Sequence, residues 1–206
     1  MKQEKKEIKA IFFDIGGVLY NESVSSKNKK NFEKKFEIPF SSYQKVVWKY
    51  VPSAQENKIS MDTYFQRISN KLKLNKKDLM DNYKKTRKKS LNLNKDVENT
   101  LIKLKKNYLL GTLTNIISIN HRLRLKKKVY KHFKIKLISC KEGLRKPDVR
   151  FYKLMIQRSK VSPKQIIFID DEEKLLLPAK QLGINTILFK TNKQLIQDLK
   201  KLGVKI

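Results

Sequence analysis

Short apolar runs alternate along most of the chain with longer segments in which apolar residues recur at helical spacing. The first run, KAIFFDI at 9–15, contains Asp14 and then meets two glycines, a pattern typical of a buried strand that stops in a turn. Further strand-like runs lie at 109–115, 135–139, 165–171 and 185–189, and helix-like segments lie at 96–106, 119–130, 148–159, 175–182 and 194–202. This alternation predicts right-handed βαβ units around a parallel sheet.

Residues 21–91 break this alternation. They contain few glycines and no strand-like run, and their apolar residues recur at helical spacing, as at 46–50 and 64–68. Ser60 stands directly before one such segment, where a serine side chain can accept hydrogen bonds from the first backbone N–H groups of a helix. We therefore predict a helical insertion of about 70 residues after the first strand.

The composition adds a large positive charge to this picture. The 206 residues fit one domain, or one domain that carries an insertion, and 49 basic against 19 acidic residues give a formal net charge of +30. Such a balance first suggests a nucleic-acid partner. However, 42 of the basic residues are Lys and only 7 are Arg. Phosphate recognition favours Arg because its planar guanidinium can form two parallel hydrogen bonds. The lysines are also scattered over every segment of the chain. We therefore expect a solvated Lys-rich surface with weak, non-specific and salt-sensitive binding to polyanions.

The sequence also bears on the environment of the protein. Cys140 is the single cysteine, which excludes an intramolecular disulfide and suits a reducing compartment. Residues 1–9 are charged and no apolar core follows them, so we expect no secretory signal. The most apolar long stretch, 108–120, is too short and too polar to span a bilayer. These features predict a soluble, cytoplasmic protein without membrane contact, and they leave the oligomeric state open.

Polar residues stand at the points where the predicted strands end. They are Asp14, the Thr114-Asn115 pair, the loop at 145–148 and the Asp170-Asp171 pair. In an open parallel sheet, ligands bind just beyond the carboxyl ends of the strands, so we expect these residues to converge. Three carboxylates would repel one another unless a cation lay between them, and oxygen ligands without nearby Cys or His favour Mg²⁺.

The same cluster contains groups that can hold an anion. Lys146, the Thr114 hydroxyl and the Asn115 amide are suited to bind phosphate, and the turn at 16–17 would let backbone N–H groups approach it closely. A carboxylate beside a cation and a phosphate site can act as a covalent nucleophile, forming an aspartyl phosphate that water then hydrolyses. The residues therefore predict phosphatase chemistry.

The motifs at these positions resemble, in order, the four motifs of the haloacid dehalogenase-like (HAD) hydrolase superfamily. They read FFDIGGVLY at 12–20, LTN at 113–115, RKPD at 145–148 and FIDDEEKLLLPAKQLGI at 168–184. The chain is most similar to the small phosphatases of this superfamily whose first motif reads D-x-G rather than D-x-D. The resemblance implies an α/β fold with a Rossmann-like parallel sheet, helices on both faces, and a small all-helical cap inserted after the first strand. The core would comprise residues 1–20 and 92–206, and the cap residues 21–91.

The resemblance also implies a role for each matching residue. The metal site would consist of Asp14, the backbone carbonyl of Gly16, Asp170 and Asp171, and the phosphate site of Gly17, Thr114, Asn115 and Lys146. Asp14 would also be the catalytic nucleophile, and Lys146 would balance its charge and that of the phosphate. Substrate choice would fall to the cap, where Trp48, Tyr43 and Tyr50 are candidate contacts, with packing inside the cap as the alternative for these rings.

Two positions depart from the family pattern. Gly16 stands where the second Asp of D-x-D usually protonates the leaving group, and a positioned general acid typically contributes about 10²–10⁴-fold. We therefore expect either a slow enzyme or a substrate with a good leaving group, such as a sugar 1-phosphate or an acyl phosphate. Leu175 stands where the fourth motif usually carries a further Asp or Asn, which removes one polar group from the expected metal site.

Taken with the resemblance, the residues predict a Mg²⁺-dependent phosphatase for a small phosphorylated metabolite. The cap carries no motif that identifies this metabolite. One alternative is a catalytically weak or inactive relative that binds a polyanion through its basic surface. Another is a haloacid dehalogenase, but that reaction needs no metal, and the retained Asp170-Asp171 pair argues against it.

Overall fold

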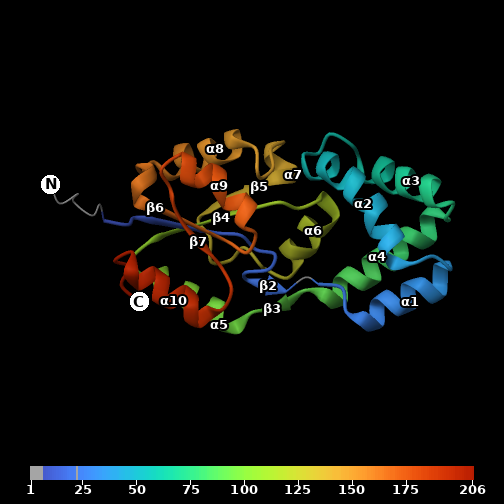
Figure 1. Cartoon of the computed structure of the whole chain (residues 1–206), viewed down its shortest axis with the longest axis horizontal. Coiled ribbons are helices and arrows are strands. Elements are labelled where there is room, and N and C mark those ends of the chain that lie inside the picture. Colours follow the sequence, from blue (N-terminus) through green and yellow to red (C-terminus); the bar gives the residue numbers. More distant parts are fainter. Residues whose placement is uncertain (1–6, 22) are drawn as a thin grey trace.

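A five-stranded parallel sheet forms the centre of the molecule (Figure 1). The computed structural model describes residues 7–21 and 23–206. The strands are β1 (Ala10–Phe13), β4 (Leu109–Thr114), β5 (Ile135–Ile138), β6 (Ile166–Asp170) and β7 (Asn185–Leu188). Their order is β5–β4–β1–β6–β7, so the first strand of the chain lies in the middle of the sheet. The predicted parallel sheet is confirmed.

Helices cover both faces of this sheet because the strands are apolar on both sides. In β1, Phe12 joins one buried cluster while Ile11 and Phe13 join another, as the two-residue period of a strand requires. The first cluster is covered by α8 (Val149–Ser159) and α9 (Glu173–Gln181), and the second by α5 (Lys95–Leu104) and α10 (Asn192–Lys201). Figure 1 shows these two pairs of helices on opposite sides of the strands. The predicted α/β fold class is thus confirmed.

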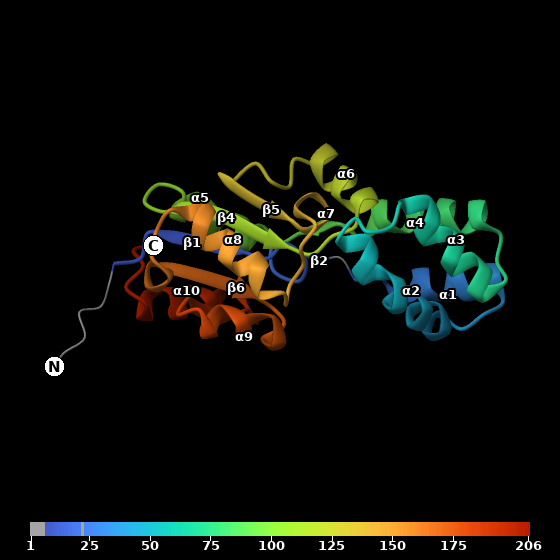
Figure 2. The ribbon, with the colours of Figure 1, turned by 90° about the horizontal axis from the view of Figure 1, so that it is seen from above.

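A second, all-helical part lies beside the carboxyl ends of the strands (Figure 2). It consists of α1 (Ser26–Phe36), α2 (Phe40–Gln55), α3 (Met61–Leu72) and α4 (Lys76–Ser90). These helices enclose their own apolar cluster, in which the ring of Phe32 lies 5.4 Å from that of Phe40 and 4.6 Å from that of Tyr43. Each fully buried side chain of this size contributes about 1.5–3 kcal/mol to stability.

Two short strands lie where the chain enters and leaves the helical part. These strands, β2 (Tyr20–Asn21) and β3 (Asn92–Leu93), pair with each other in antiparallel fashion. The predicted domain boundaries, after residues 20 and 91, fall at these two strands. The division into two domains stays a prediction.

The ends of two helices show whether the sequence predicted helix boundaries correctly. Ser60 caps α3 as predicted, since its Oγ accepts a hydrogen bond of 3.0 Å from the Thr63 N–H. The helix predicted at 119–130 is wrong at its far end, because α6 (Ser118–Lys126) stops earlier. There Lys128 adopts a left-handed φ of 52°, and the Val129 N–H returns to the Arg124 carbonyl at 3.0 Å.

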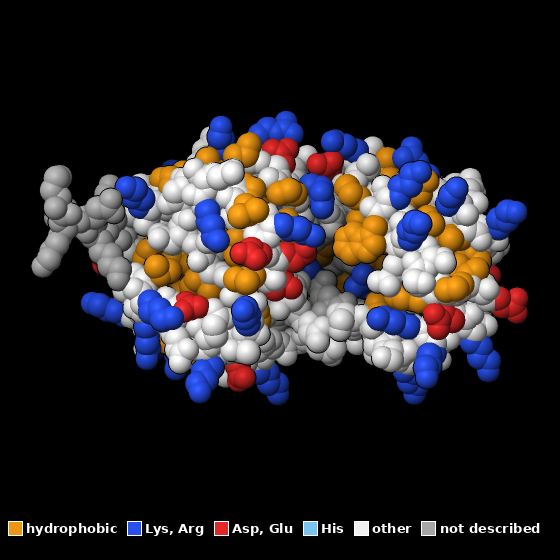
Figure 3. Space-filling model, viewed as in Figure 1, with side chains coloured by type: hydrophobic (Ala, Val, Ile, Leu, Met, Phe, Trp, Pro, Cys, Tyr) orange, Lys and Arg blue, Asp and Glu red, His pale blue; other side chains and the backbone are white. Residues whose placement is uncertain are grey.

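On the face of the molecule in Figure 3, Lys and Arg side chains do not gather on one part. Figure 3 shows Lys and Arg over both the core and the helical part on the face in view. Within the described residues, no helix combines the length and the apolar character that crossing a membrane requires.

Candidate active site

The carboxyl ends of neighbouring strands bring the predicted polar residues together. β4 and β6 flank β1, with Phe13 paired to Thr112 on one side and to Ile169 on the other. Asp14 follows directly, and its backbone N–H donates to the Ile169 carbonyl at 2.8 Å. On the other side, the Thr112 hydroxyl donates to the Phe13 carbonyl at 2.8 Å. The sheet therefore fixes the backbone on which Asp14 stands.

Lys146 is fully buried between two carboxylates. Its Nζ lies 2.6 Å from Asp170 Oδ2 and 3.3 Å from Asp14 Oδ1. Burial alone would lower the pKa of the Lys146 ammonium, but the charges of Asp14 and Asp170 outweigh burial and hold this pKa above its usual range. Lys146 therefore stays charged and neutralises part of the carboxylate charge.

Asp171 completes a cluster of three carboxylates. One oxygen atom from each of Asp14, Asp170 and Asp171 lies within 4.8 Å of the other two. Burial, together with the nearby charge of Asp14, raises the pKa of Asp171 to about 6. Asp14 Oδ1 is buried and accepts no hydrogen bond from any described residue, although Lys146 lies at ion-pair distance. One ammonium among three carboxylates leaves excess negative charge, which a divalent cation would balance.

The three carboxylate oxygens lie within 4.8 Å of one another, so an inward shift would bring them to binding distance of one Mg²⁺ ion. Ligand oxygens lie about 2.1 Å from this ion, so opposite ones are about 4.2 Å apart. Asp170 is already engaged, because its Oδ2 accepts from Lys146 and its Oδ1 accepts from the Glu172 N–H at 2.9 Å. Asp14 and Asp171 are therefore the carboxylates better placed to bind a cation.

The two glycines after β1, Gly16 and Gly17, have different roles at the candidate site. Gly17 has a φ of +76°, and a Cβ at this position would stand 1.9 Å from Asp171 Oδ2, so only glycine leaves room for that carboxylate. Its N–H donates to the Tyr20 carbonyl at 2.9 Å, so the predicted donation of this N–H to phosphate is not supported. No described residue donates a backbone hydrogen bond to the Gly16 carbonyl, which leaves this oxygen available as a ligand.

Thr114 lies at the end of β4 and contacts a residue that the sequence did not indicate. The buried guanidinium of Arg124, on α6, donates a hydrogen bond of 3.1 Å to Thr114 Oγ1. Because the oxygen accepts from Arg124, the hydroxyl proton of Thr114 is directed elsewhere, as a phosphate donor requires. The one available signal was the choice of Arg in a chain that otherwise prefers Lys.

The side chain of Asn115 holds the loop that carries Lys146. Its Nδ2 donates to the Lys146 carbonyl at 2.9 Å, and its Oδ1 accepts from the Lys146 N–H at 2.8 Å. The Asn115 amide thus positions Lys146 rather than presenting its two polar atoms to a phosphate. Ser139, on the short helix α7 (Ser139–Glu142), holds the loop that carries Asn115 by donating to and accepting from the backbone of Ile116. Neither Ser139 nor α7 was predicted.

The arrangement suits nucleophilic attack by a carboxylate on an electrophilic group that is bound as an anion. Asp14 is a buried carboxylate that protrudes from the end of the central strand, and the Lys146 ammonium stands beside it to balance charge. Tyr43 and Trp48 line a cavity that reaches Asn115, whereas Tyr50 packs against the apolar cluster of the helical part.

The model of the haloacid dehalogenase-like hydrolase family matches residues 8–183. The chain therefore belongs to this family of hydrolases, as the motifs indicated. Among solved structures, a HAD family enzyme from Bacteroides thetaiotaomicron is similar to this chain, with a TM-score of 0.76 and 22% identity over 90% of this chain and 95% of the other. Another structure of that enzyme, with a TM-score of 0.72 and 23% identity over 89% and 94% of the two chains, is a complex with magnesium and inorganic phosphate.

Curated relatives match a shorter segment. Bifunctional epoxide hydrolase 2 of Sus scrofa is 37% identical over 76 residues, which is 36% of this chain and 14% of that protein. Flavin mononucleotide hydrolase 1 of Arabidopsis thaliana is 35% identical over 68 residues, or 33% of this chain and 28% of that protein. The matches thus span less than a third of either relative.

Proposed function

We propose that this hydrolase is a Mg²⁺-dependent phosphatase that acts on a small phosphorylated metabolite through an aspartyl phosphate. The observation that carries the proposal is the cluster of Asp14, Asp170 and Asp171, in which Asp14 and Asp170 contact the buried ammonium of Lys146. The magnesium and phosphate found in the Bacteroides thetaiotaomicron enzyme support it. The four helices of residues 21–91 would form the cap over this site.

In the proposed mechanism, a carboxylate oxygen of Asp14 attacks the phosphorus atom of the substrate, and the bond from phosphorus to the ester oxygen breaks, so that the alcohol part leaves with the electron pair. Lys146 balances the charge of the nucleophile and of the phosphoryl oxygens. The Thr114 hydroxyl donates a hydrogen bond to one of these phosphoryl oxygens, and Arg124 holds the Thr114 hydroxyl in position. Mg²⁺, held by Asp14, Asp171, the Gly16 carbonyl and the nearby Asp170, would supply further positive charge where negative charge develops. Water then attacks the phosphorus of the aspartyl phosphate, which releases phosphate and restores Asp14.

A substrate panel tests this function. Phosphate release would be measured from phosphorylated metabolites and a generic aryl phosphate, in Mg²⁺ or in EDTA. We expect release that requires Mg²⁺ on at least one substrate. Release that is unchanged in EDTA would contradict the metal role. Hydrolysis of a haloacid without phosphate release would instead favour the dehalogenase.

The absence of an acid at position 16 leads to a second prediction, about the leaving group. The variant Gly16→Asp places a carboxylic acid two residues after the nucleophile, where it can protonate a leaving alkoxide. We expect the ratio of kcat for an alkyl phosphate to kcat for an aryl phosphate to rise by about tenfold or more, because only the alkoxide needs a proton to depart. The variant Gly16→Asn has the same size without the acid and serves as the control. An equal ratio in both variants would show that protonation does not limit the reaction.

A further inference from the structure

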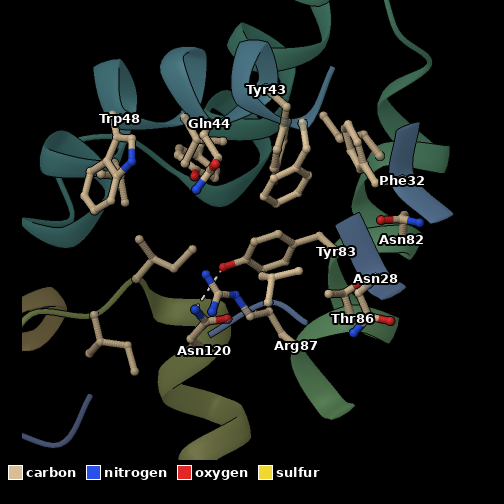
Figure 4. Close-up of a pocket in the computed structure, with 18 of the residues that line it drawn as sticks. Asn28, Phe32, Tyr43, Gln44, Trp48, Asn82, Tyr83, Thr86, Arg87 and Asn120 are labelled. Carbon is tan, nitrogen blue, oxygen red and sulfur yellow. Dashed lines mark hydrogen bonds between the residues drawn. The ribbon is translucent and has the colours of Figure 1, made fainter. Parts of the chain in front are cut away.

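A cavity of about 210 Å³ lies between the helical part and the loop that follows β4 (Figure 4). Six aromatic rings line it, those of Phe32, Phe40, Tyr43, Trp48, Tyr64 and Tyr83. In Figure 4, Trp48, Gln44 and Tyr43 reach into the space from α2, and Tyr83 and Arg87 face them from α4. The space therefore has aromatic rings on two sides.

The polar groups of this cavity are almost all neutral. Its described lining includes Asn and Gln amides but no lysine, although the chain has 42, and no described carboxylate. The one charged side chain in that lining is Arg87, which lies over the Tyr83 ring at 5.5 Å. Asn120 Nδ2 donates to Tyr83 Oη at 2.9 Å, so an amide stands at the edge of the aromatic wall. These walls suit a flat, uncharged group with a polar edge.

The cavity connects to the candidate active site through two residues that hold the Lys146 loop. Asn115 lines the cavity and exchanges two hydrogen bonds with the Lys146 backbone. Gln55 also lines it, and its Oε1 accepts a hydrogen bond of 2.9 Å from Arg145 Nε. A group in the cavity would thus lie next to the loop that positions the phosphate-binding ammonium. This is where the non-phosphate part of a substrate belongs.

The size and lining favour one ring over a polyol. An apolar cavity of about 150 Å³ holds benzene, so 210 Å³ accommodates one ring with small substituents. A flat aromatic ring can lie with its whole face against these aromatic side chains, whereas an acyclic polyol offers them no flat face. The absence of a general acid at position 16 also favours an aryl group as the leaving group. A phenol-type hydroxyl has a pKa of about 10, far below that of about 15.7 for water, and leaves readily without protonation.

We propose that this cavity binds the leaving group of an aryl phosphate, a phosphate monoester of a hydroxyl on one ring with neutral polar substituents. The proposal rests on the proposed phosphatase function. A carboxylate oxygen of Asp14 forms a bond to phosphorus, while the bond from phosphorus to the aryl oxygen breaks and the phenolate leaves with the electron pair. Water then attacks the same phosphorus, giving phosphate and the Asp14 carboxylate, and its proton passes to solvent or to the phenolate.

Ligand binding tests the cavity independently of turnover. Trp48 is the single tryptophan of the chain and lines the cavity, so its fluorescence reports occupancy. We would titrate the protein in Mg²⁺ with benzylphosphonate, cyclohexylmethylphosphonate and methylphosphonate, none of which can be hydrolysed to phosphate. We expect a saturable change with benzylphosphonate and a Kd at least about tenfold below that of methylphosphonate, with the cyclohexyl compound weaker than the aryl one. Equal Kd values for the three compounds would overturn the proposal.

A variant at the mouth of the cavity tests the same assignment by kinetics. Trp48 is 66% exposed, so Trp48→Ala leaves the apolar cluster of the helical part intact. We expect the ratio of kcat/KM for phenyl phosphate to that for acetyl phosphate to fall about tenfold, through KM. Ile102→Ala, at an exposed apolar position on α5, is the matched control and should keep the wild-type ratio. An unchanged ratio in Trp48→Ala would overturn the proposal.

The two experiments separate this inference from the phosphatase itself. Sugar phosphates that turn over faster than aryl phosphates of equal charge would overturn the aryl assignment and leave the phosphatase standing. Selective binding of benzylphosphonate at Trp48 in a protein that hydrolyses no phosphate ester would support the cavity assignment while the phosphatase failed.

Discussion

Replacing Asp14 by Asn is expected to lower the rate of phosphate release by about 10⁴-fold or more, because a neutral amide cannot form the acyl phosphate bond. The substitution keeps the size of the side chain and the backbone hydrogen bond to Ile169. It also removes one negative charge from a cluster of three carboxylates that contains one ammonium, so the apoprotein should be no less stable than the wild type. Stabilisation by Mg²⁺ should shrink, since one ligand is lost. Phosphate release and thermal unfolding with and without Mg²⁺ measure both effects.

An exposed aspartate provides the control for this substitution. Asp62 lies on α3 with its side chain 73% exposed, so Asp62→Asn should change neither the activity nor the response to Mg²⁺. Phosphate release by Asp14→Asn within tenfold of the wild-type rate would rule out Asp14 as the nucleophile.

Replacing Lys146 by Met is the second change with a large expected effect. It leaves the carboxylates of Asp14 and Asp170 buried without their cation, and breaking a buried ion pair in this way costs about 3–5 kcal/mol. Activity should be lost as well, because no other described ammonium contacts these carboxylates. The free energy of unfolding measures the loss, and Lys153→Met, at an exposed position on α8, is the control.

The pH dependence of this variant follows from the same charges. Buried carboxylates without a cation have raised pKa values, so the folded variant binds protons more readily than the unfolded chain. The penalty is therefore largest above these raised pKa values and fades as the pH falls through them toward about 4, where the unfolded carboxylates also begin to take up protons. A stability loss that does not shrink in acid would show that lost packing, rather than unpaired charge, destabilises the variant.

The sequence predicted the strands better than the ends of the helices. In β1 and β6 a run of buried apolar residues meets an aspartate at the end of the strand, and this pattern is visible without a structure. Helices often end at a glycine in the left-handed region, but here Glu37, Lys73, Lys128 and Lys160 adopt that conformation. Three of these positions are lysines, which occur throughout the chain, and the fourth is a glutamate, so no residue type in the sequence distinguished them.

In the candidate site as well, some residues could be predicted from the sequence pattern and others could not. The sequence placed Asp14, Thr114 and Asp170 at strand ends, and parallel topology alone brings such residues together. The contacts of Arg124 and Ser139 arise from α6 and α7, whose positions depend on how the chain packs after each strand. Spacing in the sequence carries no information about these contacts.

The most direct test of the account is to look for the phosphoryl group on Asp14 itself. The protein would be mixed with Mg²⁺ and its fastest substrate, quenched in acid during the first turnover, and digested for mass spectrometry. The account predicts a phosphoryl adduct on the peptide that contains Asp14, which hydroxylamine removes and which Asp14→Asn lacks. First-turnover phosphate release without an adduct on that peptide at any quench time, or with an adduct on another residue, would contradict the account.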